Sequence, residues 1–237
     1  MLKNITNVSV GKSHSILLDK FGNVYGCGLN TAGQLGLTQT ASIVTPQKIP
    51  LSNIKAISSG AFHSLFLDIF GNVFSTGDNS KGQLGIGNFI NKDVPQKISS
   101  FTIATKISAG DDNSFILENG KVYRFGNNAN GKLALNATEN PTINSPSVIE
   151  GLNGINEISA GFSHSIVFNS TDAFVFGLNI DGQFGDGTYT NSFLPKRIKA
   201  PKDFVDIKAG TTYSLLLGKY GDIYGFGNDA VSILIKV

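Results

Sequence analysis

The sequence predicts an all-β protein, specifically a β-propeller of about five four-stranded blades. Two observations predict this fold. A set of four short motifs returns about every fifty residues along the chain, and such a period is typical of solenoids, propellers and arrays. Within each period the apolar residues form short runs separated by turn residues, with no helical spacing sustained beyond a turn or two.

The repeat is marked by Gly-x-x-His-Ser and its variants. Its glycines are Gly11, Gly60, Gly110, Gly161 and Gly210, spaced 49, 50, 51 and 49 residues apart. Gly-x-Asn, a GQLG-like segment and Pro-x-x-Ile follow in that order in the first four repeats. We therefore expect one domain over residues 1–237, with repeats at approximately 5–53, 54–103, 104–154 and 155–203 and a partial repeat at 204–237.

Each repeat contains a predicted hairpin. An apolar triplet follows the His-Ser position, as in Ile16-Leu17-Leu18, and a turn such as Phe21-Gly22-Asn23 comes next. Periodicity alone would not separate a strand from a helix here, but a glycine able to take positive φ between two apolar runs favours a β-hairpin. Val24-Tyr25 begins the return strand. Pro46 then starts an outer strand, where a missing N–H costs least.

A hairpin that is apolar on both faces is not stable alone, so neighbouring sheets must stack on each side of it. Four short strands in about fifty residues fit a propeller blade. The fifth repeat lacks GQLG and Pro-x-x-Ile, and we expect the tail at 231–237 to supply its outer strand. A closed five-bladed ring is the expected arrangement. An open arc, or a fragment of a seven-bladed propeller, is the alternative.

Composition narrows the function classes. The chain has 19 Lys and Arg against 17 Asp and Glu, a net charge of +2, which offers no strong overall field for nucleic acid or an anionic membrane. A single cysteine, Cys27, and three histidines leave little material for a metal site. We expect no cofactor, no metal, no direct nucleic-acid partner and no membrane partner, and a cytoplasmic protein. A nuclear location, or delivery to a host cell by a microbe, stays open.

His14, His63 and His164 are the residues most open to a chemical interpretation, because a serine follows each of them. Adjacent strand residues point to opposite faces, so such a pair is badly placed to act as base and nucleophile. Asn113 and Tyr213 occupy the same slot in the other repeats. We predict no catalytic residue. The side chains either tie a loop to the next strand or contact a partner from one rim.

Taken together, these motifs resemble the repeat of the regulator of chromosome condensation, a β-propeller family, over residues 5–229. The type member of that family closes a seven-bladed ring and promotes guanine-nucleotide exchange on Ran. The resemblance therefore implies a protein partner, first of all a Ran-like small GTPase, and a possible exchange factor that makes and breaks no covalent bond. The type member uses a wedge between strands to displace nucleotide. No insertion of that kind is visible in this sequence.

By the same resemblance, the repeat histidines and the loops beside them lie near the GTPase-facing side. The predicted partner-binding residues are His14, His63, His164, Asp78, Asp111 and Asp112. A non-catalytic protein-interaction scaffold is the rival function, and a hydrolase or transferase is a distant third.

Overall fold

A computed structural model describes residues 2–39, 41–136, 142–198 and 204–228. They form nineteen strands in five antiparallel sheets, with one short 3-10 helix, η1 (Ala129–Gly131). No helix in these ranges is long and apolar enough to cross a membrane. The prediction of an all-β propeller with five blades is confirmed.

Four blades have four strands in simple up-and-down order. The first contains β1 (Ile5–Val10), β2 (His14–Asp19), β3 (Val24–Gly28) and β4 (Ile43–Lys48). The second contains β5 (Ile54–Ser59), β6 (His63–Asp68), β7 (Val73–Gly77) and β8 (Lys92–Lys97). The third contains β9 (Lys106–Ala109), β10 (Asn113–Glu118), β11 (Lys121–Asn127) and β12 (Thr142–Val148). The fourth contains β13 (Glu157–Ala160), β14 (His164–Phe168), β15 (Ala173–Gly177) and β16 (Ser192–Ile198).

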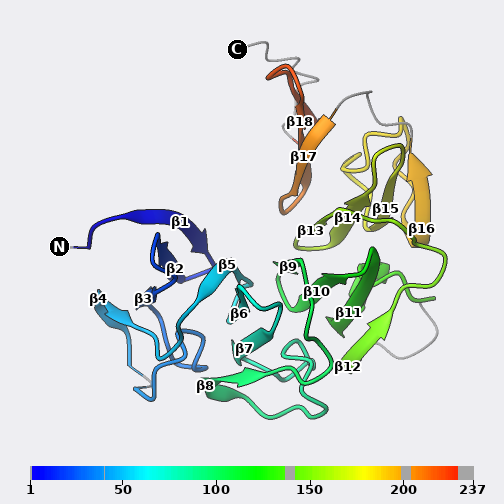
Figure 1. The fold of residues 1–237 in the computed structure, drawn as a ribbon. Helices are drawn as coiled ribbons and strands as arrows, with labels where there is room; N and C mark the ends of the chain where they lie inside the picture. The colour runs from blue at the N-terminus through cyan, green and yellow to red at the C-terminus, as the bar shows by residue number, and fades with distance from the viewer. Residues whose placement is uncertain (1, 40, 137–141, 199–203, 229–237) are drawn as a thin grey trace.

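The fifth blade has three strands among the described residues: β17 (Phe204–Ala209), β18 (Tyr213–Gly218) and β19 (Ile223–Gly227). The outer strand that we expect at 231–237 lies outside the described residues. Figure 1 shows that the first strands of the blades lie toward the centre and the fourth strands at the periphery, as in a propeller.

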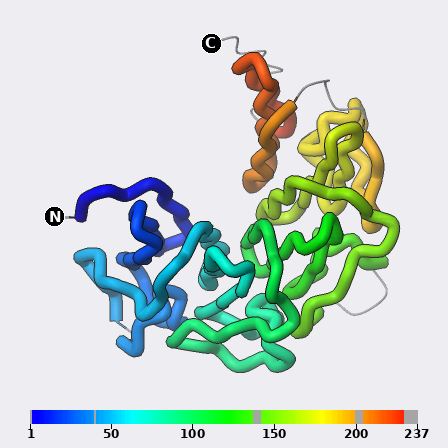
Figure 2. Tube along the Cα trace, in the orientation of Figure 1, coloured from blue at the N-terminus to red at the C-terminus, as the bar shows by residue number. Residues whose placement is uncertain are grey.

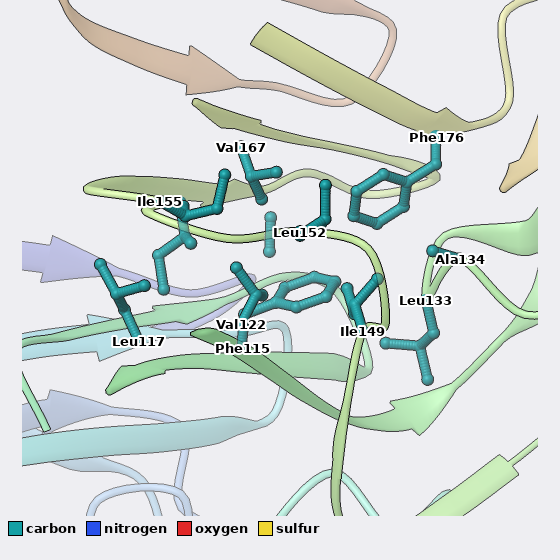
Figure 3. Packing of buried hydrophobic residues seen from close by; sticks show 12 residues of the cluster. Phe115, Leu117, Val122, Leu133, Ala134, Ile149, Leu152, Ile155, Val167 and Phe176 are labelled. Atoms are coloured by element: carbon teal, nitrogen blue, oxygen red, sulfur yellow. The ribbon is translucent and has the colours of Figure 1, made fainter. Parts of the chain in front are cut away.

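Apolar side chains fill the space between successive blades, as the stacking argument requires. The cluster between the third and fourth blades joins Phe115 and Val122 from one sheet to Val167 and Phe176 from the next (Figure 3). Phe115 and Phe176 meet edge to face, with ring centroids 5.9 Å apart. Leu152 and Ile155 of the inter-blade connection close the cluster. Each buried side chain of this size contributes roughly 1.5–3 kcal/mol relative to exposure, so the blades stabilise one another.

The described strands form an arc with one open side. The first blade and the fifth blade lie well apart in Figures 1 and 2. Their outward faces are correspondingly exposed: Val10 is 68% exposed and Leu215 is 43% exposed, whereas Leu65, which matches Leu215 in the second blade, is fully buried. Of the two predicted arrangements, the described residues follow the arc and not the closed ring.

The antiparallel order gives the arc two faces, which we name by their connections. The loop face carries the three-residue turns between first and second strands and the long loops between third and fourth strands. The turn face carries the tight turns between second and third strands and the connections between blades. Because every blade runs the same way, equivalent residues from all five blades lie on the same face.

Candidate protein-binding face

Hydrogen bonds between histidine and serine join neighbouring blades beneath the loop face. His14 Nε2 lies 3.0 Å from Ser64 Oγ, His63 Nε2 lies 2.9 Å from Ser114 Oγ, and His164 Nε2 lies 2.8 Å from Ser214 Oγ. The serine follows the histidine slot of the next blade, fifty or so residues away. We call each such bond a histidine latch.

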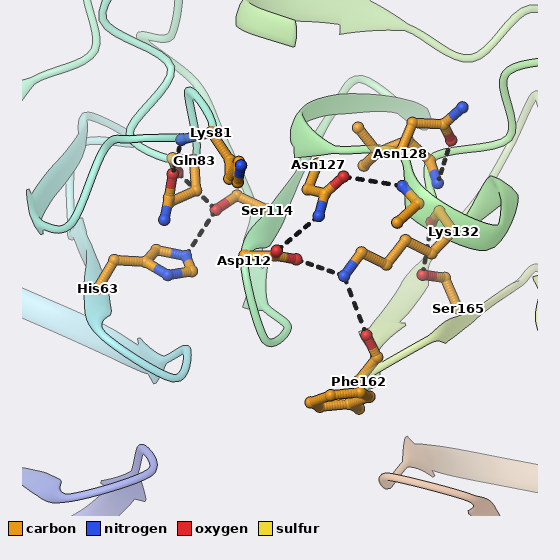
Figure 4. A network of polar contacts seen from close by, with 12 residues as sticks. His63, Lys81, Gln83, Asp112, Ser114, Asn127, Asn128, Lys132, Phe162 and Ser165 are labelled. Carbon is orange, nitrogen blue, oxygen red and sulfur yellow. Dashed lines mark hydrogen bonds and ion pairs between the residues drawn. The ribbon is translucent and has the colours of Figure 1, made fainter. Parts of the chain in front are cut away.

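The serine hydrogen fixes the tautomer of the latch. Ser114 Oγ donates to the carbonyl oxygen of Gln83 at 2.8 Å, so it accepts from His63 Nε2–H (Figure 4). His63 Nδ1 is then the unprotonated nitrogen, and it has no hydrogen-bond partner among the described residues. The other two latches repeat this arrangement, with Ser64 donating to Gln34 O and Ser214 to Gln183 O.

Burial disfavours the charged imidazolium, and it lowers the pKa of His14, His63 and His164 to about 4. All three rings are buried, with residue exposures of 3%, 0% and 0%. A latch is therefore a poor nucleophile–base pair: the serine proton is held by a carbonyl, and within the described part of the chain no carboxylate orients the imidazole. The histidines tie blade to blade with their rings buried, and their contact with a partner stays a prediction.

Glycine in the Gly-x-x-His motif leaves room for the latch. A Cβ on Gly60 would overlap the ring of His63 and the carbonyl oxygen of Gly110. The motif therefore couples a residue without a side chain to the ring that lies over it. Glycine is required where another group approaches the backbone this closely.

The junction between the third and fourth blades is built differently. Asn113 stands in the histidine slot, and neither polar atom of its buried side chain has a partner among the described residues. Lys132 replaces the glutamine of GQLG, pairs with Asp112, and donates to the carbonyl oxygen of Phe162 in the fourth blade at 3.1 Å (Figure 4). An ion pair takes the place of the missing latch.

The innermost strands carry a second set of cross-blade bonds. The hydroxyl oxygens of Ser9, Ser58, Ser108 and Ser159 each accept a backbone N–H from the following blade at 2.8–2.9 Å. Lys208 occupies this serine position in the fifth blade, and Tyr213 occupies the histidine position there. The fifth blade thus lacks both bonding groups on its exposed outer face.

At the centre of the loop face the three-residue turns surround an open hub cavity of about 590 Å³. The residue after each motif glycine lines it: Lys12, Ala61, Asp111, Phe162 and Thr211. Ala61 donates its N–H to the Asp111 carbonyl at 2.9 Å, and Phe162 donates to Gly210 at 3.1 Å, so the backbone of this lining is fixed. Its side chains are left to face the cavity.

The three predicted aspartates all lie on the loop face, but in different states. Asp78 accepts hydrogen bonds from Ser80 and Gln83, and Asp112 is paired with Lys132. Asp111 has no side-chain bond among the described residues. Partial burial, and then the charge of Asp112, raise the pKa of Asp111. Its carboxylate is the one most available to a cationic group.

The sequence showed the histidines but not their partners. Serine fills the position after the histidine slot in all five repeats, even where the slot holds Asn113 or Tyr213. That constancy is the signal that could have identified Ser64, Ser114 and Ser214 as the receiving groups. No group of three or more His, Cys, Asp or Glu side chains that could hold a metal ion occurs among the described residues.

A family model described as the regulator of chromosome condensation (RCC1) repeat matches residues 22–67, 71–117, 119–168 and 172–217, and a second model of the same repeat matches 5–34 and 54–83. These matches span most of the chain. The chain belongs to the RCC1 repeat family. The resemblance predicted from the motifs is confirmed.

Solved structures agree with this membership. Human WBSCR16 superimposes with a TM-score of 0.84 at 22% sequence identity, over 97% of this chain and 63% of that one. Prp20p from Saccharomyces cerevisiae, whose structure was described with its binding properties to Gsp1p and histones, gives 0.83 at 24%, over 95% and 57%. At these identities the likeness shows the fold alone.

A curated relative covers less of the chain. A bifunctional serine/threonine-protein kinase/NEDD4-like E3 ubiquitin-protein ligase from Dictyostelium discoideum is 29% identical over 104 residues, which is 38% of this chain and 6% of that protein. In each of these three comparisons the chain spans less than two thirds of the other protein's length.

Proposed function

We propose that this RCC1-repeat propeller binds a protein partner through its loop face and that the partner is a small GTPase. The observation that carries the proposal is the hub cavity with the free carboxylate of Asp111 at its rim. A partly buried carboxylate without a partner attracts a cationic side chain more strongly than an exposed one does. Family membership, and a structural neighbour studied for its binding to Gsp1p, support a GTPase as the first candidate.

The loop face also carries exposed apolar side chains. Phe162 is half exposed at the rim of the cavity, and Phe89 and Ile90 are exposed on the long loop of the second blade. Aromatic residues such as phenylalanine are enriched at protein interfaces relative to the rest of the surface. Three latches and the Lys132–Asp112 pair join the five blades beneath this face, so the face is preorganised for binding.

Exchange activity is a finer proposal. A factor that drives exchange must bind the nucleotide-free GTPase more tightly than the loaded form, and a 10⁴-fold shift requires about 5.5 kcal/mol of differential affinity. Among the described residues the turns and long loops form no extended wedge, and the two long loops described in full, at 78–91 and 178–191, are of equal length. This equality favours the second candidate, a scaffold that binds a GTPase or another protein without exchanging nucleotide.

Binding and exchange are measured together on a panel of small GTPases. Pull-down reports binding, and release of fluorescent GDP reports exchange. We expect Asp111→Lys to weaken binding about tenfold or more, and Glu150→Gln on the turn face to leave it unchanged. Binding without accelerated release supports the scaffold. Absence of both across the panel contradicts a GTPase partner.

A further inference from the structure

The tight turns of the first two blades project aromatic side chains into solvent. Phe21 is 67% exposed and Phe70 is 65% exposed. Ile69 and Ile103 are exposed beside them, and Ile103 lies against the Phe70 turn, because Ala104 donates its N–H to the Gly71 carbonyl at 3.0 Å. We name Phe21, Ile69, Phe70 and Ile103 the apolar tips. They lie on the turn face, opposite the hub cavity and the histidine motifs.

The fold does not require aromatic residues at these tips. The third and fourth blades make the corresponding turns with Asn119 and Thr171. In the first two blades an aspartate shapes the turn: Asp19 Oδ1 accepts from the N–H groups of Phe21 and Asn23, both at 2.9 Å. Asp68 does the same for Phe70 and Asn72, at 2.9 and 2.8 Å. These bonds use only the backbone of the phenylalanines, and the Lys20 ammonium lies 5.1 Å from the centroid of the Phe21 ring.

Lysines surround the tips. Those on or next to the turn face of the first two blades are all exposed: Lys3, Lys20, Lys48, Lys55 and Lys97. None of them takes part in an ion pair between described residues. The only acidic side chains of these blades on that face, Asp19 and Asp68, are buried within the turns. An approaching surface therefore meets these lysines and the aromatic rings, together with one carboxylate, Glu118 of the third blade, which accepts the Ile103 N–H at 3.1 Å.

We propose that the turn face of the first two blades docks on an anionic lipid bilayer. Separate tips that stand out from a rim fit a soft planar surface, whereas a protein partner needs a continuous complementary one. Aromatic rings settle at the level of the lipid headgroups, with lysines reaching anionic lipids around them. The basic side chains are lysines, whose attraction to a charged surface needs no bidentate geometry. The loop face stays free on the side away from the lipid.

The chain contains no tryptophan, so a single one reports its own surroundings. Phe21→Trp and Phe70→Trp place the probe at two tips, and Phe89→Trp places it on the loop face as the matched control. Vesicles are of phosphatidylcholine alone or with one third phosphatidylserine. We expect the emission of the two tip probes to shift to the blue only with phosphatidylserine, and the control probe not to shift.

Co-sedimentation with the same vesicles measures affinity. Each lysine near an anionic surface contributes about fivefold, so Lys20→Gln, Lys48→Gln and Lys97→Gln together should weaken partition about 100-fold. The triple change Lys12→Gln, Lys81→Gln, Lys92→Gln on the loop face should have little effect. Phe21→Ser with Phe70→Ser should also release the protein, and this pair leaves every charge in place.

Three results would overturn the proposal. The first is no binding to phosphatidylserine vesicles. The second is binding that the loop-face lysines, and not the turn-face lysines, control. The third is binding of duplex DNA or RNA that competes with the vesicles and does not need the aromatic tips, which would assign the lysines to nucleic acid.

Discussion

His63 and Asn113 occupy the same position in the second and third repeats, and exchanging the two residue types tests how much stability a histidine latch contributes. His63→Asn places in the second blade the residue that the third blade has naturally. The change removes the bond to Ser114 at 2.9 Å, from a site with no solvent access. Leaving buried polar groups without a partner costs about 1–3 kcal/mol, and loss of ring volume adds to this cost. We expect a total of about 2–4 kcal/mol.

The reciprocal change is the control. Asn113→His places an imidazole ring within reach of Ser165 of the fourth blade. Ser165 Oγ already donates to the Lys132 carbonyl at 2.9 Å, so it can accept a hydrogen bond from the new Nε2–H. It also removes two unpartnered polar atoms. We expect it to stabilise the protein by about 1 kcal/mol.

The assay is denaturant unfolding followed by far-ultraviolet circular dichroism, with thermal melts alongside. For a chain of this size 1 kcal/mol moves the melting temperature by roughly 2–4 °C. A His63→Asn variant as stable as the parent would refute the latch as a source of stability. An Asn113→His variant that is strongly destabilised would show that the third junction cannot hold a ring, and the two junctions would then not be equivalent.

Three further predictions concern the same junctions. Gly60→Ala should destabilise by more than 2 kcal/mol, because the new methyl group overlaps the His63 ring and the Gly110 carbonyl; pairing it with His63→Ala should recover part of the loss in the same unfolding assay. Acid should weaken the fold: the three histidines have a folded pKa of about 4, below their ordinary 6.5, so as pH falls from 6.5 to 4 the unfolded chain takes up protons that the folded chain refuses. Each histidine lowers the free energy of unfolding by up to about 3 kcal/mol, and a melting temperature unchanged between pH 7 and pH 4.5 contradicts this prediction. Lys132→Met should cost about 2 kcal/mol by stranding Asp112, whereas Lys132→Gln, the residue of three other repeats, should be milder in melts of the two variants side by side.

The blades could be predicted from the sequence because the strands and turns of each blade are specified by residues close together in the chain. The turn at Phe21-Gly22-Asn23 and the apolar run before it lie within ten residues, and their return every fifty residues implies stacking. Gly-x-Asn could be recognised but not explained: Asn79 Oδ1 accepts the Leu84 N–H at 3.0 Å and folds the long loop back on itself. Such a bond depends on a loop conformation that no strand pattern specifies.

The candidate site was harder to predict, because its groups come from different blades. His63 and Ser114 are fifty-one residues apart, and strand alternation only excludes the serine next in sequence. Net charge, similarly, carries no information about how charges are distributed over the two faces. A total of +2 conceals that the exposed charges on the turn face of the first two blades are all lysines. Ring closure could not be decided either, because it depends on the angle between sheets, which composition does not fix.

The open side of the arc has a mechanical consequence. In a complete circle the angles between sectors must add to a full turn, so no junction widens unless another narrows. The described strands carry no such constraint, since the first and last sectors do not meet. Among the described residues, a partner seated at the centre therefore meets blades whose mutual angles are set by their junctions alone, three of them with a latch and the one between the third and fourth blades with an ion pair.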